Sequence, residues 1–211
     1  DHVVESFLRN APQIISSDLF AVTLIERDAP TQARTFLAFP AQGQKKAIER
    51  TSMNSSVMQF VASRPDGCWV DGSEAYAFLA PLMTLGATGF LILPAFRDGK
   101  LAAILAFGSI GKHVLSEEEC VYARDFADRL GVALTATARD EELHFQAHYD
   151  ATTALPNRRF FKDRLSQEIG RARRESRPIS LLFIDLDEFK KINDSVGHAG
   201  GDEVLEQASR R

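Results

Sequence analysis

Short apolar and polar runs alternate along the N-terminal half of the chain and predict a mixture of strands and helices. Residues 20–25, 35–39 and 68–70 form apolar runs of strand length bounded by polar residues. Residues 3–15 and 55–62 carry their apolar side chains in a pattern that suits helices instead. These segments predict an α+β domain in which helices cover a sheet.

The longest uncharged stretch, residues 75–96, requires a membrane test because a spanning helix needs about 20 mostly apolar residues. Two prolines and two glycines interrupt it, so we expect a short helix over residues 78–85 and a strand over residues 90–93. Asp98 and Gly99 then predict a hairpin turn into a strand over residues 101–107. The chain is therefore expected to contain no membrane segment.

A long helix is predicted from Glu117 to Tyr149. An S-x-x-E capping box that begins at Ser116 marks its start. Small and apolar side chains then follow alternating steps of three and four residues, at Ala123, Phe126, Leu130 and Ala133. Either this stripe packs on the sheet of its own domain, or it pairs with the same helix of a second copy in a parallel homodimer. We favour pairing, because a change of packing in a helix interface is a recurrent signalling device.

Charge and cysteine content exclude several classes of protein. The chain has 25 Lys and Arg against 29 Asp and Glu, a net charge of −4, so nothing in it argues for binding nucleic acid. Cys68 and Cys120 are too few and too far apart for a disulfide framework or a zinc site. Since no signal peptide is visible, the expected location is the reducing cytoplasm.

Residues 181–203 gather the residue types of a nucleotide site. Residues 181–184 form an apolar run of strand length, and Asp185 and Asp187 follow at its carboxyl end, the usual ligand edge of a sheet. Carboxylates there suit Mg²⁺, which binds few protein oxygens together with substrate phosphates. Capping of the next helix is the alternative role for either carboxylate. Asn193, His198 and Asp202 add donors and acceptors suited to the edge of a base.

With these residues in view, the segment resembles the first half of a GGDEF domain, the catalytic fold of diguanylate cyclases. The family pattern D-x-D-x-F-K-x-I-N-D-x-x-G-H-x-x-G-D is matched at every fixed position from Asp185 to Asp202. A block from Asp150 resembles the family's entry motif D-x-L-T-G-L-P-N-R-R. It departs at Thr152, where the family has Leu, and at Ala154, where the family has Gly, the residue that suits unusual backbone angles.

The resemblance implies the family's reaction, in which two GTP molecules give cyclic di-GMP and two diphosphates. Each GGDEF domain holds one GTP, so the active form is a dimer, and Mg²⁺ orients the phosphates. The resemblance also implies a role for each matched residue. Asp185 and the backbone carbonyl of Leu186 bind the metal, Asn193 and Asp202 read guanine, His198 supports that end of the site, and Phe189 and Lys190 hold phosphates.

The four letters from Gly200 to Glu203 read like the family's name but are not its signature. They belong to the G-H-x-x-G-D block, whereas the signature lies on a later hairpin that the 211 residues do not reach. The catalytic Glu is thus absent, and we expect this chain alone to be inactive and the intact protein to be a cyclase. Two alternatives stay open. One is a degenerate GTP-binding GGDEF domain that regulates a downstream EAL phosphodiesterase, and the other is a sensor or dimerisation module only.

The first part of the chain resembles a GAF domain in its order of helix, hairpin, helix, short strand, hairpin and closing helix. The expected organisation is a GAF-like sensor at residues 1–137, a linker helix at 138–149 and an incomplete GGDEF domain, of the cyclase-like ferredoxin type, at 150–211. The sequence names no GAF ligand. The large side chains that are candidates to line a GAF pocket are expected to be core instead: Trp69, Tyr76, Phe78, Met83 and Phe90.

Overall fold

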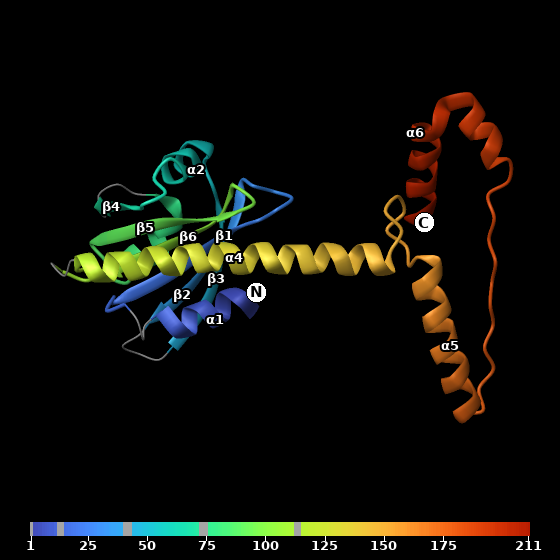
Figure 1. The fold of residues 1–211 in the computed structure, drawn as a ribbon, viewed down its shortest axis with the longest axis horizontal. Helices are drawn as coiled ribbons and strands as arrows, with labels where there is room; N and C mark the ends of the chain where they lie inside the picture. Colours follow the sequence, from blue (N-terminus) through green and yellow to red (C-terminus); the bar gives the residue numbers. More distant parts are fainter. Residues whose placement is uncertain (1, 12–14, 40–43, 72–75, 112–114) are drawn as a thin grey trace. The chain divides into compact units, whose positions relative to one another are not determined.

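The computed structural model describes residues 2–11, 15–39, 44–71, 76–111 and 115–211. The chain divides into two compact units, Asp1–Thr137 and Ala138–Arg211. We call these the first and the second unit and describe each by itself (Figure 1).

An antiparallel sheet in the order β3-β2-β1-β6-β5-β4 forms the middle layer of the first unit. Its strands are β1 Leu19–Ile25, β2 Gln32–Phe39, β3 Gln44–Ser52, β4 Cys68–Asp71, β5 Gly89–Arg97 and β6 Lys100–Ser109. Strands β1 and β6 lie at the centre, where Phe20 pairs in register with Phe107. The sheet is therefore built from strands far apart in the sequence.

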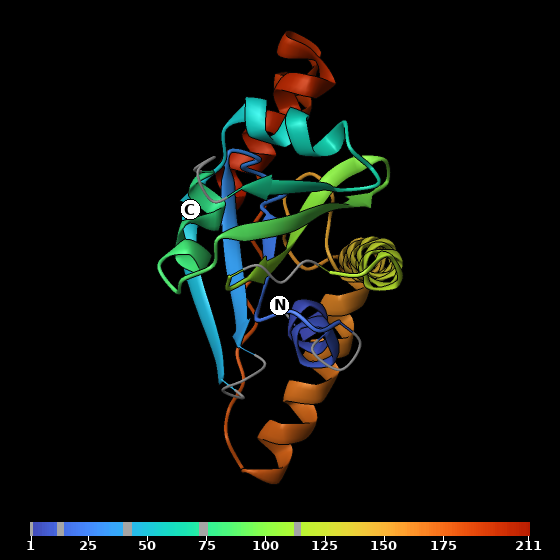
Figure 2. The ribbon, with the colours of Figure 1, turned by 90° about the vertical axis from the view of Figure 1, so that its left-hand side faces the viewer.

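Helices cover both faces of this sheet (Figure 2). They are α1 His2–Asn10, α2 Ser55–Ala62, the 3₁₀ helix η3 Ala77–Leu79, α3 Ala80–Met83 and α4 Glu117–His148. Side chains alternate between two buried clusters, so that Phe20 and Val22 of β1 pack with α1 and α4. Leu19 and Ala21 pack instead with α2, η3 and α3. The first unit thus has three layers and two cores.

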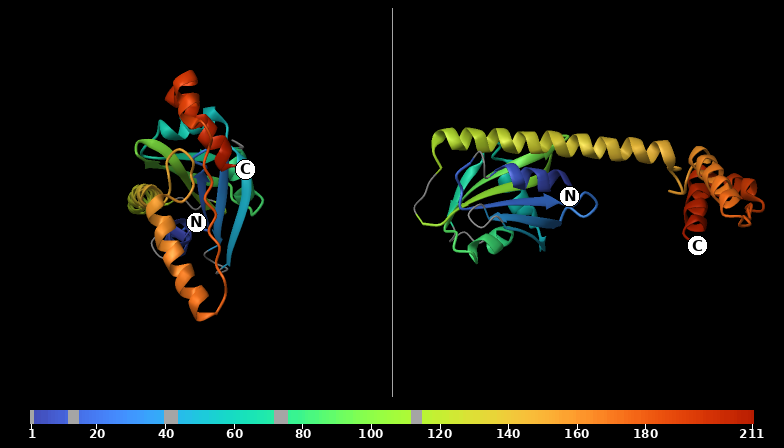
Figure 3. Two further views of the ribbon diagram at one scale, coloured as in Figure 1. Left: turned by 90° about the vertical axis from the view of Figure 1, so that its right-hand side faces the viewer. Right: turned by 90° about the horizontal axis from the view of Figure 1, so that it is seen from below.

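The apolar stripe of α4 is buried against the sheet of its own unit. Ala123, Phe126 and Leu130 are 0%, 7% and 0% exposed. An aromatic chain runs through this core, because Phe126 contacts Phe7 of α1 at 4.8 Å and Phe20 of β1 at 6.0 Å between ring centroids. Figure 3 shows α1 beside α4. Pairing of this stripe with a second copy, the interpretation favoured from the sequence, is therefore wrong.

The capping box at the start of α4 is confirmed. Ser116 N donates to Glu119 Oε2 at 2.8 Å, and Glu119 N donates to Ser116 Oγ at 3.2 Å. Glu119 Oε1 also accepts from Ser16 N at 3.2 Å, which ties the helix start to the segment before β1. The hydrogen bond from the Ser116 backbone is the largest cause that lowers the pKa of Glu119 below its ordinary value.

The Asp98-Gly99 hairpin was predicted from the sequence, whereas strand β3 was not. The hairpin at Asp98 and Gly99 is confirmed, and both residues have the positive φ of a two-residue turn, 49° and 75°. Strand β3 was not expected, because its sequence QKKAIERTS is polar. It lies at the edge of the sheet, where charged residues are common because they oppose pairing with other chains.

The second unit is mainly helical in its described residues. It contains the last turns of α4, then α5 Arg158–Arg174 and α6 Phe189–Ser209. Helix α6 is two helices that meet at Gly197, whose φ of 79° and ψ of 170° break the helical path. In the described parts of both units, no helix is long and apolar enough to cross a bilayer.

Gly131 sets the distance between α4 and the sheet. A Cβ at this position would collide with the carbonyl oxygen of Phe96 and would lie 3.2 Å from its nitrogen. Phe96 lies at an irregularity in the pairing of β5 with β6, where the register shifts. The helix therefore contacts strand backbone directly, and only glycine fits.

We predict that Gly131→Ala lowers the free energy of unfolding of the first unit by roughly 1–3 kcal/mol, because the added methyl must push the helix off β5. Gly89→Ala is the control, since a Cβ there meets nothing within 4 Å. Urea unfolding followed by circular dichroism measures both. Equal stability of the Gly131 variant and the wild type would contradict the close approach.

Candidate functional site

The site region begins with a tight turn that follows α4. Asp150 Oδ1 accepts hydrogen bonds from Thr153 N at 3.0 Å and from Thr153 Oγ1 at 2.8 Å. The backbone closes around it, as Asp150 N donates to Leu155 O and Ala154 N donates to Asp150 O, both at 2.9 Å. The bond from the Thr153 backbone is the largest cause that lowers the pKa of Asp150.

Asn157 joins the end of α4 to the start of α5. Its Oδ1 accepts from Phe160 N at 3.0 Å and so caps α5. Its Nδ2 donates to Ala147 O at 3.0 Å, and its backbone nitrogen donates to His148 O at 2.8 Å. The Phe160 ring also packs against His148, at 4.9 Å between centroids. We call this set of contacts the joint; the sequence signal for it was an Asn directly before a helical pattern.

Ala154 occupies a left-handed position in this turn, with φ of 54°. The expectation that the family's Gly serves an unusual backbone angle here is confirmed. An L-residue in this region is strained by roughly 1–2 kcal/mol relative to glycine. The turn nevertheless closes, since the Asp150, Thr153 and Asn157 hydrogen bonds hold it.

The strand expected over residues 181–184 is not formed. These residues form no regular secondary structure and are exposed, with Leu182 at 81% and Phe183 at 84%. A strand needs a neighbour for its backbone hydrogen bonds, and the described part of the second unit supplies none for this segment. Asp185 and Leu186 follow on this segment and are exposed as well.

Helix α6 brings two of the expected site residues together. The break at Gly197 sets Phe189 and Asn193 against the buried Gly201. A Cβ on Gly201 would collide with Asn193 Oδ1 and lie 3.3 Å from Phe189 Cζ. The four-residue spacing of Gly197 and Gly201 in the G-H-x-x-G motif therefore has a physical reason, because the first glycine reverses the chain and the second leaves room for the amide.

The remaining expected residues are exposed and apart from this contact. Lys190, His198 and Asp202 face solvent. The N-cap of α6 is Glu188, in the left-handed region and without a side-chain cap bond, so neither Asp185 nor Asp187 caps this helix. Within the described ranges, no group of three or more His, Cys, Asp or Glu is placed to hold a metal ion.

The donor chemistry nevertheless fits Mg²⁺. Asp185 offers a carboxylate and Leu186 a backbone carbonyl, both hard oxygen donors. This cation commonly takes one or two carboxylates and completes its shell with water and substrate phosphates. Two protein oxygens at this place therefore match a metal that arrives with a nucleotide.

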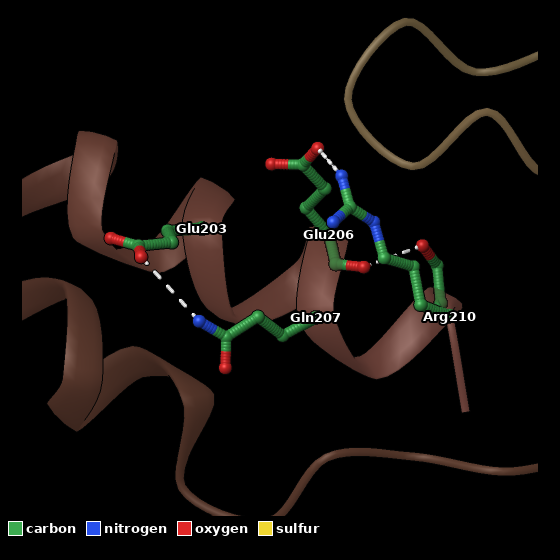
Figure 4. A network of polar contacts seen from close by, with 5 residues as sticks. Glu203, Glu206, Gln207 and Arg210 are labelled. Carbon is green, nitrogen blue, oxygen red and sulfur yellow. Dashed lines mark hydrogen bonds and ion pairs between the residues drawn. The ribbon is translucent and has the colours of Figure 1, made fainter.

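The four letters from Gly200 to Glu203 lie within α6 and form no hairpin. Glu203 Oε1 accepts from Gln207 Nε2 at 3.4 Å, and Glu206 pairs with Arg210 one turn later (Figure 4). These are surface contacts between neighbouring turns of one helix. Glu203 thus lies on the surface of a helix and not on a hairpin.

Most of the candidate pocket residues of the first unit are core. Phe78 and Phe90 are fully buried between the sheet and its helices, whereas Trp69 on β4 is 43% exposed. One hollow beside Tyr76 and Phe78 has a volume of about 210 Å³. It is lined by Ser52, Met53, Asn54, Val57, Tyr76, Ala77 and Phe78. This volume is below the roughly 300–1,000 Å³ of typical ligand pockets.

Comparison with known families agrees with the geometry of the second unit. Residues 147–211 match the family model described as diguanylate cyclase, GGDEF domain. Residues 147–211 therefore have the sequence pattern of a GGDEF domain. The match begins at Ala147, whose carbonyl accepts from Asn157, so it includes the whole entry turn as well as α5 and α6.

Two curated relatives from Pseudomonas aeruginosa extend this result. Diguanylate cyclase TpbB is 47% identical over 78 residues, which cover 36% of this chain and 18% of that protein. The bifunctional diguanylate cyclase/cyclic di-GMP phosphodiesterase MucR is 32% identical over 146 residues, 69% of this chain and 21% of that protein. The chain therefore spans about a fifth of the length of these relatives.

Solved structures give the fold of the first unit. The blue-light absorbing form of the Thermosynechococcus elongatus PixJ GAF domain matches with a TM-score of 0.53 at 14% identity. The match covers 71% of this chain and 94% of that structure. The first unit has a GAF fold, followed by a long helix and GGDEF sequence.

The entry turn makes a measurable prediction. Ala154→Gly should slow amide exchange at position 154 and at Asn157, because glycine relieves the strain of the left-handed backbone. We expect the free energy needed to open this turn to rise by about 0.5–1 kcal/mol. This figure is the relief of strain minus the cost of the greater freedom that glycine has in the open chain. Ala151→Gly is the matched control in the same turn, since Ala151 has an ordinary φ. Faster amide exchange in the Ala154→Gly variant than in the wild type would contradict a strained, left-handed backbone at this position.

Proposed function

We propose that this protein acts in cyclic di-GMP signalling, with a GAF sensor unit controlling a GGDEF diguanylate cyclase. The observation that carries the proposal is the match at every fixed motif position from Asp185 to Asp202, within a segment that the family model covers. The reaction is the condensation of two GTP molecules to cyclic di-GMP and two diphosphates. A substrate of this kind places the protein in the cytoplasm, where GTP is made.

Each matched residue has a proposed task in binding GTP. Asp185 and the Leu186 carbonyl hold Mg²⁺, which neutralises charge on the phosphates when it is bound. Asn193 and Asp202 hydrogen-bond the guanine edge, and His198 supports that end of the site. Phe189 and Lys190 hold phosphates through backbone amides and the ammonium group. The contact of Asn193 with Gly201 supports the guanine role, because it holds the Asn193 amide against the residue that precedes Asp202 in the chain.

The proposed organisation is a sensor at residues 1–137, a linker helix at 138–149 and a GGDEF segment at 150–211. The 211 residues do not contain the G-G-[DE]-E-F hairpin with its catalytic Glu. We therefore expect this chain by itself to form no cyclic di-GMP, and it serves as the blank in the assays below.

The reaction requires two copies, and we place the contact on the exposed side of α4. Three exposed apolar side chains, Val121, Val132 and Leu143, lie eleven residues apart in a row along the helix. Eleven residues are close to three helical turns, so the row keeps to one face. This face is opposite the stripe of Phe126 and Leu130, which the first unit already buries.

Val132→Lys should shift the chain from dimer to monomer in sedimentation experiments without unfolding it, because Val132 is 70% exposed. Ile110→Lys is the control, since Ile110 is exposed but lies outside α4. Leu130→Lys is unsuitable, because it would place a charge in the core. An unchanged dimer in folded Val132→Lys protein would exclude this face.

Two substitutions in the full gene product separate metal binding from base recognition. Asp185→Asn removes a charged ligand and should weaken Mg²⁺-dependent GTP binding and turnover by about 10-fold or more. Asp202→Ala should instead reduce the preference for GTP over ATP, because a site built to hydrogen-bond one base discriminates through those bonds. Binding of both nucleotides is measured with and without Mg²⁺. Wild-type behaviour of both variants would show that these carboxylates are structural.

A second candidate function has its own support. The similarity to MucR, described as a bifunctional cyclase and phosphodiesterase, extends over an alignment too long for the second unit alone. It favours a hybrid in which the GGDEF domain binds GTP and regulates a phosphodiesterase. Cyclic di-GMP hydrolysis that GTP stimulates, without synthesis, would establish this alternative over the cyclase.

A further inference from the structure

Two histidines lie together at the end of α4, outside every residue assigned to the nucleotide. His144 and His148 are four residues apart, which places them on one face of the helix. Their rings are stacked, with centroids 4.3 Å apart and an angle of 27° between the planes. His144 is exposed and His148 is half-buried, so solvent reaches the pair.

The hydrogen bonding of His148 leaves a metal-binding nitrogen available. His148 Nδ1 lies 2.8 Å from the carbonyl oxygen of His144. A carbonyl oxygen can only accept, so Nδ1 carries the proton and Nε2 of the neutral ring keeps a free lone pair. Metal-binding histidines commonly donate their other ring N–H to a carbonyl or carboxylate in this way. The edge contact with Phe160 holds the same ring from a second side.

We propose that His144 and His148 form a two-point chelating site for a divalent transition-metal cation that prefers imidazole, such as Cu²⁺, Ni²⁺ or Zn²⁺. Pairs of histidines four residues apart on a helix are a known zinc-binding arrangement. Since the described residues hold no third His, Cys, Asp or Glu in place, water completes the coordination shell and the affinity is modest. Mg²⁺ is excluded, because it prefers oxygen ligands.

Metal bound here would act on the joint. His148 O accepts from Asn157 N, and the His148 ring touches Phe160, so the last turn of α4 and the start of α5 share this residue. A cation bound to both imidazoles links two successive turns of the helix, so it stabilises the helical state of that segment. The site therefore stiffens the connection between α4 and α5 independently of any nucleotide.

Calorimetric titration of the 211-residue chain with Cu²⁺, Ni²⁺, Zn²⁺ and Mg²⁺ tests the site. We expect saturable binding of the first three and none of Mg²⁺. His144→Gln and His148→Gln should each weaken binding by about 10-fold or more. His2→Gln is the matched control, since His2 is an exposed helical histidine with no second histidine in the sequence of its helix, and this variant should bind as the wild type does. Unchanged binding in either joint variant, or no saturable binding by the wild type, would overturn the proposal.

Amide exchange gives a second readout that binding elsewhere would not move. Ni²⁺ should slow exchange at residues 148–150 and at Asn157 in the wild type, and a chelator should reverse the effect. The two variants should show no such change with the same metal. Binding that leaves these amides unaffected would refute the stiffening of the joint.

Discussion

Burial of the α4 stripe on the sheet of the first unit is the interaction on which the remaining structure depends. Phe126 lies between Phe7 and Phe20, and burying a side chain of this size stabilises a fold by about 1.5–3 kcal/mol. Leu130 is fully buried a turn later, beside the glycine that lets the helix touch β5. This packing commits one face of α4 to its own unit, so the stripe of Phe126 and Leu130 is not available to a second chain.

The same helix is held at its other end by polar contacts. Asn157 binds two carbonyls of the last turn of α4 and caps α5 with its amide oxygen. The carboxylate of Asp150 closes the turn between them. Helix α4 is therefore held by apolar packing in the first unit and by polar contacts at the joint.

In the second unit, the features that depend on nearby residues are formed and those that need distant partners are not. The entry turn, the α5 cap and the reversal at Gly197 depend on neighbours in the sequence, and all three are formed. Residues 181–184 depend on strands elsewhere, and their apolar side chains remain exposed. Asp185 follows directly on this segment, so its direction is set only when the segment is paired. The motif residues from Asp185 to Asp202 are therefore not gathered in one place, apart from the contact of Phe189 and Asn193 with Gly201.

The motifs and the local backbone features could be predicted from the sequence, because they depend on interactions between residues close together in the chain. The capping box at Ser116, the Asp98-Gly99 hairpin and the special angle at position 154 needed only neighbouring residues. The surface that the α4 stripe packs against could not be predicted from the sequence. Apolar residues spaced three and four positions apart suit packing on a sheet as well as on a second helix. Only the tertiary structure decided between them, because the central strands present Phe20 and Phe107 where Phe126 docks. Polar β3 and the exposed residues 181–184 follow the same rule, since strands form only where partners exist.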